Sequence, residues 1–257
     1  MILTIDIGNS HIMLGGFLKN ELCFVSRIST DPARTEDEYA CRFLEALTLH
    51  GINKHAITGA IVASVVPPLN ATVRQAIRFV FGVDPLFVGP GIKSGISIRC
   101  DIPSSVGSDL IAAALAAHTI YQSPALIIDM GTATKMTVVD RKGAFIGTSI
   151  IPGVMMGLNA LAEKTAQLPK ISLETPPTVI AKNTQDCMRS GILFGNASLI
   201  DGMIDRIREE FGEDLVLTAT GGMAPLVIPL CKHTIHLDEH LVLKGLNILY
   251  QKNRPEH

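Results

Sequence analysis

Short runs of apolar residues, interrupted by polar pairs and glycines, make up the first part of the chain. The stretches ILTIDIGN (residues 2–9), HIMLGGFL (11–18) and LCFVSRIS (22–29) each have the length and composition of a β-strand. Lys19 and Asn20 form a turn signal between the second and third stretches. This pattern predicts a three-stranded meander.

The spacing of apolar residues then changes to that of a helix. Residues 35–51 begin with an acidic first turn, repeat apolar residues every three or four positions and stop at Gly51. GAIVASVVPPLN (59–70) is typical of a buried strand that ends at paired prolines, and ATVRQAIRFVFG (71–82) predicts a second helix closed by a glycine. The first part therefore has the order βββαβα.

A similar order recurs in the second part of the chain. Strands are expected at ALIIDMGTA (125–133), KMTVVD (135–140) and AFIGTSI (144–150), followed by a helical stretch. A further strand, LVLTATGG (215–222), and a C-terminal helix, LVLKGLNILYQKN (241–253), complete the series. The recurrence suggests an internal duplication.

Two matched distances support the duplication. Asp6 and Asp129 both end a strand, both lie two residues before a glycine, and are 123 residues apart (129 − 6). The turn residues Lys19 and Lys142 are separated by the same 123 residues (142 − 19). A single Asp-x-Gly at a strand end is ordinary turn chemistry. Two copies at one offset, each followed by a hairpin, favour a functional role.

Such a turn combines three chemical features. The aspartate can hold a hydrated cation, the glycine lets the backbone approach a ligand, and Asn9, Ser10 or Thr132 offer polar groups to phosphate. Two of these turns can hold a nucleoside triphosphate from both sides. The chain contains no GxxxxGK[ST], and GPGIKSG (89–95) has the wrong spacing for GxGxxG. A third glycine element, TATGGMA (218–224), either lets an adenine ring lie against the backbone or forms a tight strand-to-helix turn.

The composition of the chain indicates which kinds of molecule it can bind. The 257 residues are 47% hydrophobic, with a net charge of -2 and no cluster of lysine and arginine, which disfavours nucleic acid and acidic membranes as partners. Five cysteines without a CxxC pair indicate reduced thiols, and no apolar run reaches the length of about 20 residues that spans a bilayer. We expect a soluble, cytoplasmic protein that binds small molecules.

Six motifs, in this order and over nearly the whole chain, carry a family resemblance: DIGNS, PGIKSG, VGSD, DMGTAT, IIPG and ATGG. In these motifs the chain resembles type III pantothenate kinase, within the superfamily of acetate kinase, sugar kinases, heat-shock proteins and actin. The resemblance implies an α/β fold with a duplicated βββαβα unit, that is, a ribonuclease H-like, actin-like ATPase fold. We expect two similar subdomains around a nucleotide cleft, at residues 1–122 and 123–257.

The resemblance also implies an activity. It is the ATP-dependent phosphorylation of pantothenate to 4'-phosphopantothenate, a phosphotransfer to an alcohol and the first step of coenzyme A biosynthesis. A homodimer, Mg²⁺ with ATP, and a monovalent cation such as K⁺ or NH₄⁺ are implied with it. Two alternatives remain open: a kinase of the same fold with a different acceptor, and a non-catalytic nucleotide-binding regulatory relative of the accessory factor type.

Individual residues take roles from the same resemblance. Asp109 would accept the proton of the pantothenate hydroxyl, Asp129 would bind the monovalent cation, and Asp6 would organise the magnesium shell. With the paired glycines added, the expected ATP-binding residues are Asp6, Ile7, Gly8, Asn9, Ser10, His11, Ile12, Met13, Gly131, Thr132, Gly221 and Gly222. The expected substrate-binding residues are Cys100, Gly107, Ser108, Asp109, Leu110 and Thr184, the last at the dimer interface.

Position alone suggests another role for Asp109, because it lies near the start of a helical run whose expected caps are Ser104 or Ser105. There an aspartate complements the helix dipole. Three residues depart from the family pattern. Leu110 and Cys100 stand where an arginine and a tyrosine are usual, and Lys135 replaces a threonine. Lys135 either supplies positive charge to the site or belongs to a solvated strand face.

Two further stretches have ordinary explanations. CKHTIHLDEH (231–240) brings three histidines close together but lacks the HExxH order, so a polar surface loop is favoured over a zinc site. Met155 and Met156 lie at helical positions, where core packing is the default expectation. In the family this helix also supports the dimer interface.

Overall fold

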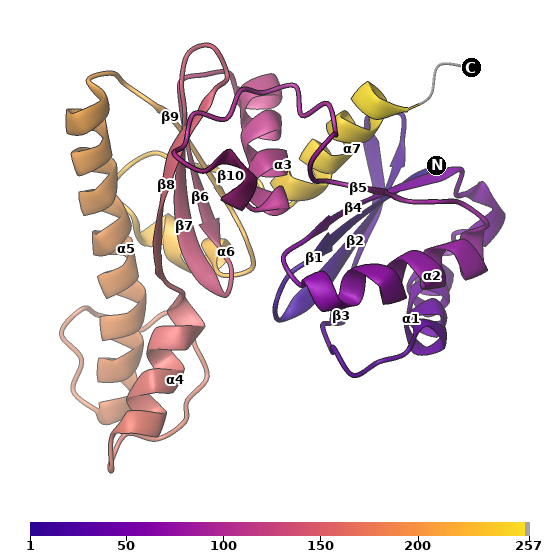
Figure 1. The fold of residues 1–257 in the computed structure, drawn as a ribbon. Coiled ribbons are helices and arrows are strands. Elements are labelled where there is room, and N and C mark those ends of the chain that lie inside the picture. Colours follow the sequence, from indigo (N-terminus) through magenta and orange to yellow (C-terminus); the bar gives the residue numbers. More distant parts are fainter. Residues whose placement is uncertain (255–257) are drawn as a thin grey trace. The chain divides into compact units, whose positions relative to one another are not determined.

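The computed structural model describes residues 1–254 and divides into two compact units (Figure 1). The first unit comprises Met1–Thr119 together with the stretch from Leu241 onward, and the second comprises Ile120–His240. Each unit contains one five-stranded sheet with helices packed on it.

The first sheet has the strand order β3-β2-β1-β4-β5. Its strands are β1 (Ile2–Ile7), β2 (His11–Leu18), β3 (Glu21–Ser29), β4 (Gly59–Ser64) and β5 (Leu86–Phe87). The first three form the meander that the sequence predicts, and β4 joins β1 in parallel. A parallel neighbour requires a crossover connection, which α1 provides.

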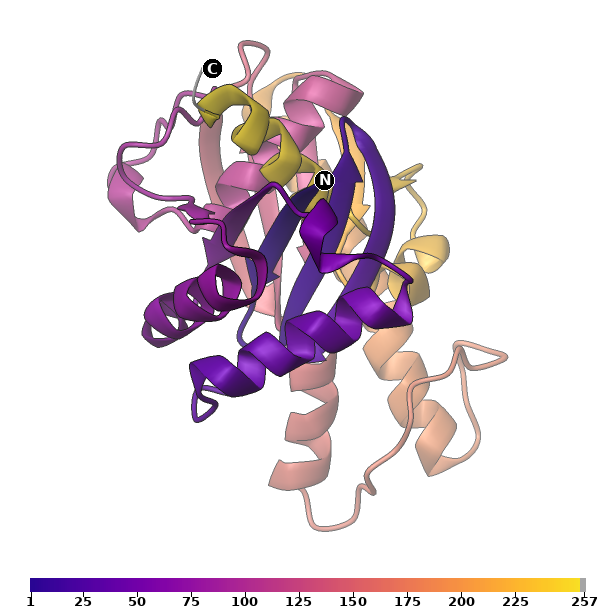
Figure 2. The same cartoon turned by 90° about the vertical axis from the view of Figure 1, so that its right-hand side faces the viewer.

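Two helices, α1 (Glu36–Leu49) and α2 (Asn70–Phe81), pack side by side on one face of this sheet (Figure 2). Thr35 caps α1 in a reciprocal capping box with Glu38, which satisfies backbone groups at the helix start. Gly82 ends α2 in the left-handed conformation with φ of 68°, as its position in the sequence predicts. The apolar faces of both helices bury the odd-numbered positions of β1.

The opposite face of the first sheet packs against α3 (Ser108–Ala116) and α7 (Leu241–Asn253). The boundary expected at residue 123 assigned the C-terminal helix to the second half, and the structure contradicts this assignment. The reason is packing: Leu243, Leu246 and Leu249 complete the core on this face of the first sheet. Gly245 allows the close approach, because a Cβ there would collide with the Ala112 carbonyl.

The second sheet repeats the first, with the order β10-β9-β6-β7-β8. Its strands are β6 (Ala125–Met130), β7 (Ala133–Val139), β8 (Phe145–Pro152), β9 (Val216–Thr220) and β10 (His236–Leu237). The central strands β1 and β6 begin and end 123 residues apart, at Ile2 and Ala125 and at Ile7 and Met130. The duplication inferred from the two aspartates is therefore a duplication of structure.

Three helices pack on one face of the second sheet: α4 (Val154–Lys164), α5 (Thr184–Phe211) and α6 (Ala224–Val227). The face they cover carries alternate residues of β6, namely Leu126, Ile128 and Met130. Asp129 belongs to the opposite face of that strand, because successive side chains alternate. The shorter helical turns are Lys54–Ala56, Pro67–Leu69, Pro103–Ser105, Ala117–Tyr121 and Ile228–Leu230.

Helix α4 does not bury its methionines. Met155 and Met156 are 42% and 50% exposed, so the expectation of core packing is wrong for both. Only Val154 and Leu158 of this helix are buried, because α4 packs along one side against α5 and extends beyond the sheet with it (Figure 1). Within residues 1–254, no helix combines the length and the apolar character needed to cross a bilayer.

Candidate active site

The turn between β1 and β2, called here the first tip, comprises residues 8–11. Gly8 N–H donates to the carbonyl of His11 at 3.0 Å, which closes the turn. Thr30, the residue after β3, holds this turn: its hydroxyl donates to the Gly8 carbonyl at 2.6 Å and its N–H donates to the Ser10 carbonyl at 3.0 Å. Asn9 and Ser10 are exposed at the end of this fixed turn. The first tip therefore presents two polar residues at the surface of the first unit.

The expected ATP-binding segment around this tip contains two kinds of residue. Ile7 and Ile12 are fully buried in the core, so their side chains are not available to a ligand. Asp6 is partly buried at the end of β1. Its side chain alternates with that of Ile7, and therefore belongs to the sheet face that α3 and α7 cover.

The start of α3 is fixed to the same edge of the first sheet. Ser64 ends β4 and is in register with Ile7 of β1. The Ser108 hydroxyl accepts a hydrogen bond from Ser64 N–H at 2.8 Å and donates to the Ser64 carbonyl at 3.1 Å. Asp109, the next residue, therefore lies at the carboxyl edge of the sheet, on the face to which Asp6 belongs. The fold thus places at one edge and on one face of the sheet two carboxylates that are about a hundred residues apart in the sequence.

Asp109 lies in the first turn of α3 and is 9% exposed. Its Oδ1 accepts a hydrogen bond from the backbone N–H of Leu110 at 2.9 Å. A carboxylate at this position complements the dipole of the helix. Both roles considered for Asp109, dipole complement and proton acceptor, are compatible with this placement.

The residue that precedes the helix is Gly107, which makes no side-chain cap. The expected caps, Ser104 and Ser105, are wrong: both lie in a separate turn, where the Ser105 hydroxyl donates to the Ile102 carbonyl. A Cβ at Gly107 would lie 2.5 Å from Asp109 Oδ1. Glycine therefore leaves the space that the carboxylate occupies.

The other expected substrate residues are dispersed. Leu110 is buried beside Asp109, at 8% exposed. Cys100 lies in the loop that precedes α3, where burial raises the pKa of its thiol and the Asp101 carboxylate adds to the shift, so the thiol stays neutral. Thr184 is exposed at the start of α5, in the second unit. The structure thus groups Gly107, Ser108, Asp109 and Leu110, but not Thr184, within the first unit.

The turn between β6 and β7, called here the second tip, comprises residues 131–133. Gly131 N–H donates to the carbonyl of Ala133 at 3.2 Å, and Gly131 and Thr132 are exposed. Gly153, at the start of α4, packs directly on this turn. A Cβ there would collide with the Thr132 carbonyl and lie 2.8 Å from that of Gly131. The IIPG motif therefore supports the second tip through close backbone contact.

The glycine pair after β9 meets the same end of the sheet. Gly221 has φ of 93°, and a Cβ on it would lie 2.7 Å from the backbone N, C and O atoms of Met130. Met223 N–H donates to the Met130 carbonyl at 3.1 Å, which holds the turn against β6. Gly222 is exposed beside it. DMGTAT, IIPG and ATGG, far apart in the sequence, thus meet at one end of the second sheet.

Asp129 precedes the second tip and is paired with a lysine. Lys135 lies directly across from Asp129 on β7, and its Nζ is 2.8 Å from Asp129 Oδ2. The two side chains are 18% and 15% exposed. The alternative of a solvated strand face for Lys135 is therefore wrong. Sequence reasoning noted the lysine but not its partner, which depends on the hairpin register.

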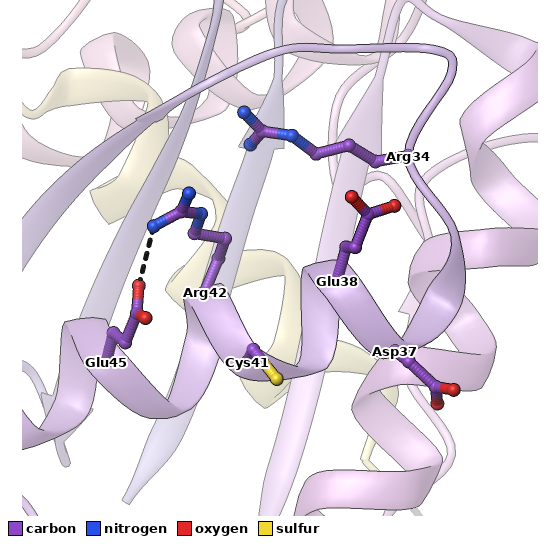
Figure 3. Close-up of a pocket in the computed structure, with 6 residues that line it drawn as sticks. All are labelled: Arg34, Asp37, Glu38, Cys41, Arg42 and Glu45. Carbon is purple, nitrogen blue, oxygen red and sulfur yellow. Dashed lines mark hydrogen bonds and ion pairs between the residues drawn. The ribbon is translucent and has the colours of Figure 1, made fainter.

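A hollow on the outer surface of α1 contains none of the motif residues. Figure 3 shows its lining side chains, which are Arg34, Asp37, Glu38, Cys41, Arg42 and Glu45. Arg42 pairs with Glu45 at 2.8 Å, and the backbone hydrogen bond from Thr35 lowers the pKa of Glu38. These charged groups interact with one another and with the backbone at the start of α1, so we do not assign the active site to this hollow.

A second hollow lies between α5 and the histidine-rich stretch. Asp201 accepts a hydrogen bond from the backbone N–H of Lys232 at 2.9 Å, and His233 Nε2 lies 2.9 Å from Asp205 Oδ1. Within residues 1–254, no three His, Cys, Asp or Glu side chains are grouped so as to hold a metal ion. The contacts of this stretch join it to α5.

Comparisons with known proteins agree on a family. Residues 2–206 match the family described as type III pantothenate kinase. The protein of that name from Geotalea daltonii is 41% identical over 254 residues, covering 99% of each chain. That from Geobacter sulfurreducens is 40% identical, covering 99% of this chain and 100% of the relative.

Solved structures with low sequence identity share the fold. Component A of (R)-2-hydroxyglutaryl-CoA dehydratase from Acidaminococcus fermentans is 16% identical, with a TM-score of 0.56 over 97% of this chain and 96% of the other. The activator of 2-hydroxyisocaproyl-CoA dehydratase from Clostridium difficile, solved with bound ADPNP, is 11% identical, with a TM-score of 0.55 over 100% and 98%. They confirm the actin-like ATPase fold. With this duplicated fold, a glycine in each of its two tips and full-length relatives at about 40% identity, the chain belongs to the type III pantothenate kinase family.

Proposed function

We propose that the protein transfers the γ-phosphoryl group of ATP to the hydroxyl of pantothenate, giving 4'-phosphopantothenate and ADP in the first step of coenzyme A biosynthesis. The observation that carries the proposal is the placement of Asp109. The Ser108 contact to Ser64 fixes it at the sheet edge where Asp6 and the first tip lie. Family membership supports the choice of substrates.

In this reaction Asp109 orients the pantothenate hydroxyl and accepts its proton. The hydroxyl oxygen forms a bond to the γ-phosphorus, and the bond from that phosphorus to the bridging oxygen of ADP breaks. Phosphoryl transfer passes through a loose transition state, which depends on positioning and charge neutralisation more than on a strong base. An aspartate fixed in the first turn of a helix is suited to this positioning role.

The proposed phosphate contacts of ATP come from residues of the two tips, and the proposed adenine contacts come from Gly221 and Gly222. Asn9 and Ser10 offer polar groups to phosphate oxygens from the first tip, and Thr132 does so from the second. We propose that the adenine lies against the backbone at Gly221 and Gly222, of which Gly222 is exposed. Asp6 is a partly exposed carboxylate at a strand end, which fits the one or two protein ligands that Mg²⁺ takes beside nucleotide phosphates. When bound, Mg²⁺ neutralises the charge that develops on the phosphates.

Asp129 fits a dissolved monovalent cation poorly. Its Oδ2 is already in contact with the Lys135 ammonium. The proposed reaction therefore does not use a dissolved monovalent cation.

A homodimer is part of the proposal, with Thr184 approaching pantothenate at the interface. Exposed apolar side chains near the β8–α4 junction, Ile150, Met155 and Met156, support an interface there. We expect sedimentation equilibrium to give twice the chain mass of 27.5 kDa. A monomeric mass at assay concentrations would contradict it.

The test of the function is ADP formation by the purified protein with MgATP, in the presence and absence of pantothenate. Pantothenate-dependent turnover is expected. Turnover only with another alcohol would indicate a shifted acceptor. Tight nucleotide binding without any phosphorylated acceptor would instead support a regulatory protein.

Substituting Gly107 with alanine tests how Asp109 is positioned. Because the new Cβ would lie 2.5 Å from Asp109 Oδ1, the carboxylate must rotate away, while φ of -59° suits alanine and stability changes little. We expect kcat to fall about 10- to 100-fold with a smaller change in KM for ATP. Gly89→Ala is the matched control, since nothing lies within 4 Å of its Cβ position. Equal kcat values for the two variants would contradict the positioning role.

A further inference from the structure

The two halves of the duplication differ at one pair of positions. Asp6 and Asp129 correspond to each other, but their neighbours across the hairpin do not. Met13 is in register with Asp6 on β2, whereas Lys135 is in register with Asp129 on β7. Side chains in register share one face of a sheet, with Cβ atoms about 5 Å apart. This geometry brings the ammonium of Lys135 to the second tip.

The pair of Lys135 with Asp129 is sheltered from water. The side chains are 18% and 15% exposed, and Nζ lies 2.8 Å from Oδ2. Salt screens such a pair less than it screens a surface ion pair, and a carboxylate in this position requires a cationic partner. Lys135 is attached to the chain, so its local concentration at the carboxylate far exceeds that of a dissolved ion. It also carries the single charge and the N–H donors of an ammonium ion.

We propose that Lys135 is a built-in monovalent cation at the second tip. Its ammonium takes the place of the K⁺ or NH₄⁺ that the family resemblance assigns to Asp129, and phosphoryl transfer by this protein needs no added monovalent ion. The inference rests on the proposed function. It changes one feature of that function: the monovalent cation is supplied by a residue of the chain and not by a dissolved ion.

The first test measures pantothenate-dependent ADP formation while tetramethylammonium chloride is replaced by KCl or NH₄Cl at constant ionic strength. We expect the wild-type rate to vary by less than about twofold across the series. Lys135→Thr leaves Asp129 without its ammonium and supplies a hydroxyl oxygen in a residue suited to strands. Its rate is expected to fall about tenfold or more without K⁺ and to recover as K⁺ or NH₄⁺ is added.

The second test detects ion binding without catalysis. Thermal unfolding of both proteins is followed in the same salt series, with no substrate present. A ligand that binds only the folded state raises Tm with its concentration. We expect the wild-type Tm to be the same in tetramethylammonium and K⁺, and the Tm of Lys135→Thr to rise by a few degrees in K⁺. Lys142→Thr removes the same charge from the exposed β7–β8 turn and should behave as the wild type in both tests.

Two results would overturn the proposal. One is a wild-type rate and Tm that depend on K⁺ as strongly as those of Lys135→Thr. The other is a Lys135→Thr protein as active and as independent of salt as the wild type. If the wild type forms no ADP with pantothenate in any salt, the proposed function fails, and the unfolding series alone decides whether Lys135 replaces the ion. The measurements on the wild type test the proposal even if a variant does not fold.

Discussion

Replacing Asp109 with asparagine is expected to abolish most pantothenate phosphorylation while leaving ATP bound. The side-chain oxygen of asparagine still accepts the Leu110 N–H, so the start of α3 keeps its geometry. The amide cannot take up the hydroxyl proton, and positioned acid–base groups contribute about 10²- to 10⁴-fold to rate. We therefore expect kcat to fall by about this factor in a steady-state ADP assay.

The control for this substitution is Asp101→Asn, in the exposed loop that precedes α3. It removes the same charge from the same region, and its kcat should match that of the wild type. Nucleotide affinity measured by calorimetry should be similar in all three proteins. Full activity in Asp109→Asn would remove Asp109 from the mechanism, and a loss of ATP binding would reassign it to the nucleotide.

Gly221→Ala should strongly destabilise the second unit. The substitution combines two costs: a φ of 93°, which alanine rarely adopts, and a Cβ 2.7 Å from backbone atoms of Met130. Strain of this kind costs about 1–3 kcal/mol, and overpacking costs about 1–3 kcal/mol more. Backbone atoms of a central strand cannot rotate away as a side chain can. We expect Tm to drop by about 10 °C or more, with loss of ATP binding as the glycine turn is displaced.

Gly212→Ala separates the two costs. Gly212 ends α5 with φ of 76°, but nothing lies within 4 Å of its Cβ position. Only the left-handed conformation is then penalised, by about 1–2 kcal/mol. A similar loss of Tm in both variants would mean that the close contact with Met130 contributes nothing.

Local patterns in the sequence predicted most of the elements, but not the two-residue strands β5 and β10. Short apolar runs bounded by turn residues predicted β1, β2 and β6, an acidic first turn predicted α1, and Gly82 predicted the end of α2. These signals act through backbone groups a few residues apart, so they need no knowledge of the rest of the chain. Asp6 and Asp129 are separated by the same number of residues as the two turn lysines, and this equality predicted a duplicated fold. Six short motifs then indicated the family.

The errors fell where packing between distant segments decides the outcome. The serines expected to cap α3 lie in a separate turn, because a contact between Ser108 and Ser64, far apart in the chain, sets where the helix begins. Helix α7 completes the core of the first sheet, although it follows the second sheet in sequence. Met155 and Met156 are exposed because α4 has a packing partner along one side only.

By itself, the sequence determined the longer strands and helices, the duplication and the identity of the residues at each tip, because these depend on local periodicity and turn chemistry. Only the tertiary structure decided which side chains meet. Asp109 reaches the edge occupied by Asp6 because the crossover strand β4 anchors α3 there. Lys135 reaches Asp129 because the hairpin register places them opposite each other. Such contacts depend on the summed geometry of strand pairing and packing, which no local stretch of sequence contains.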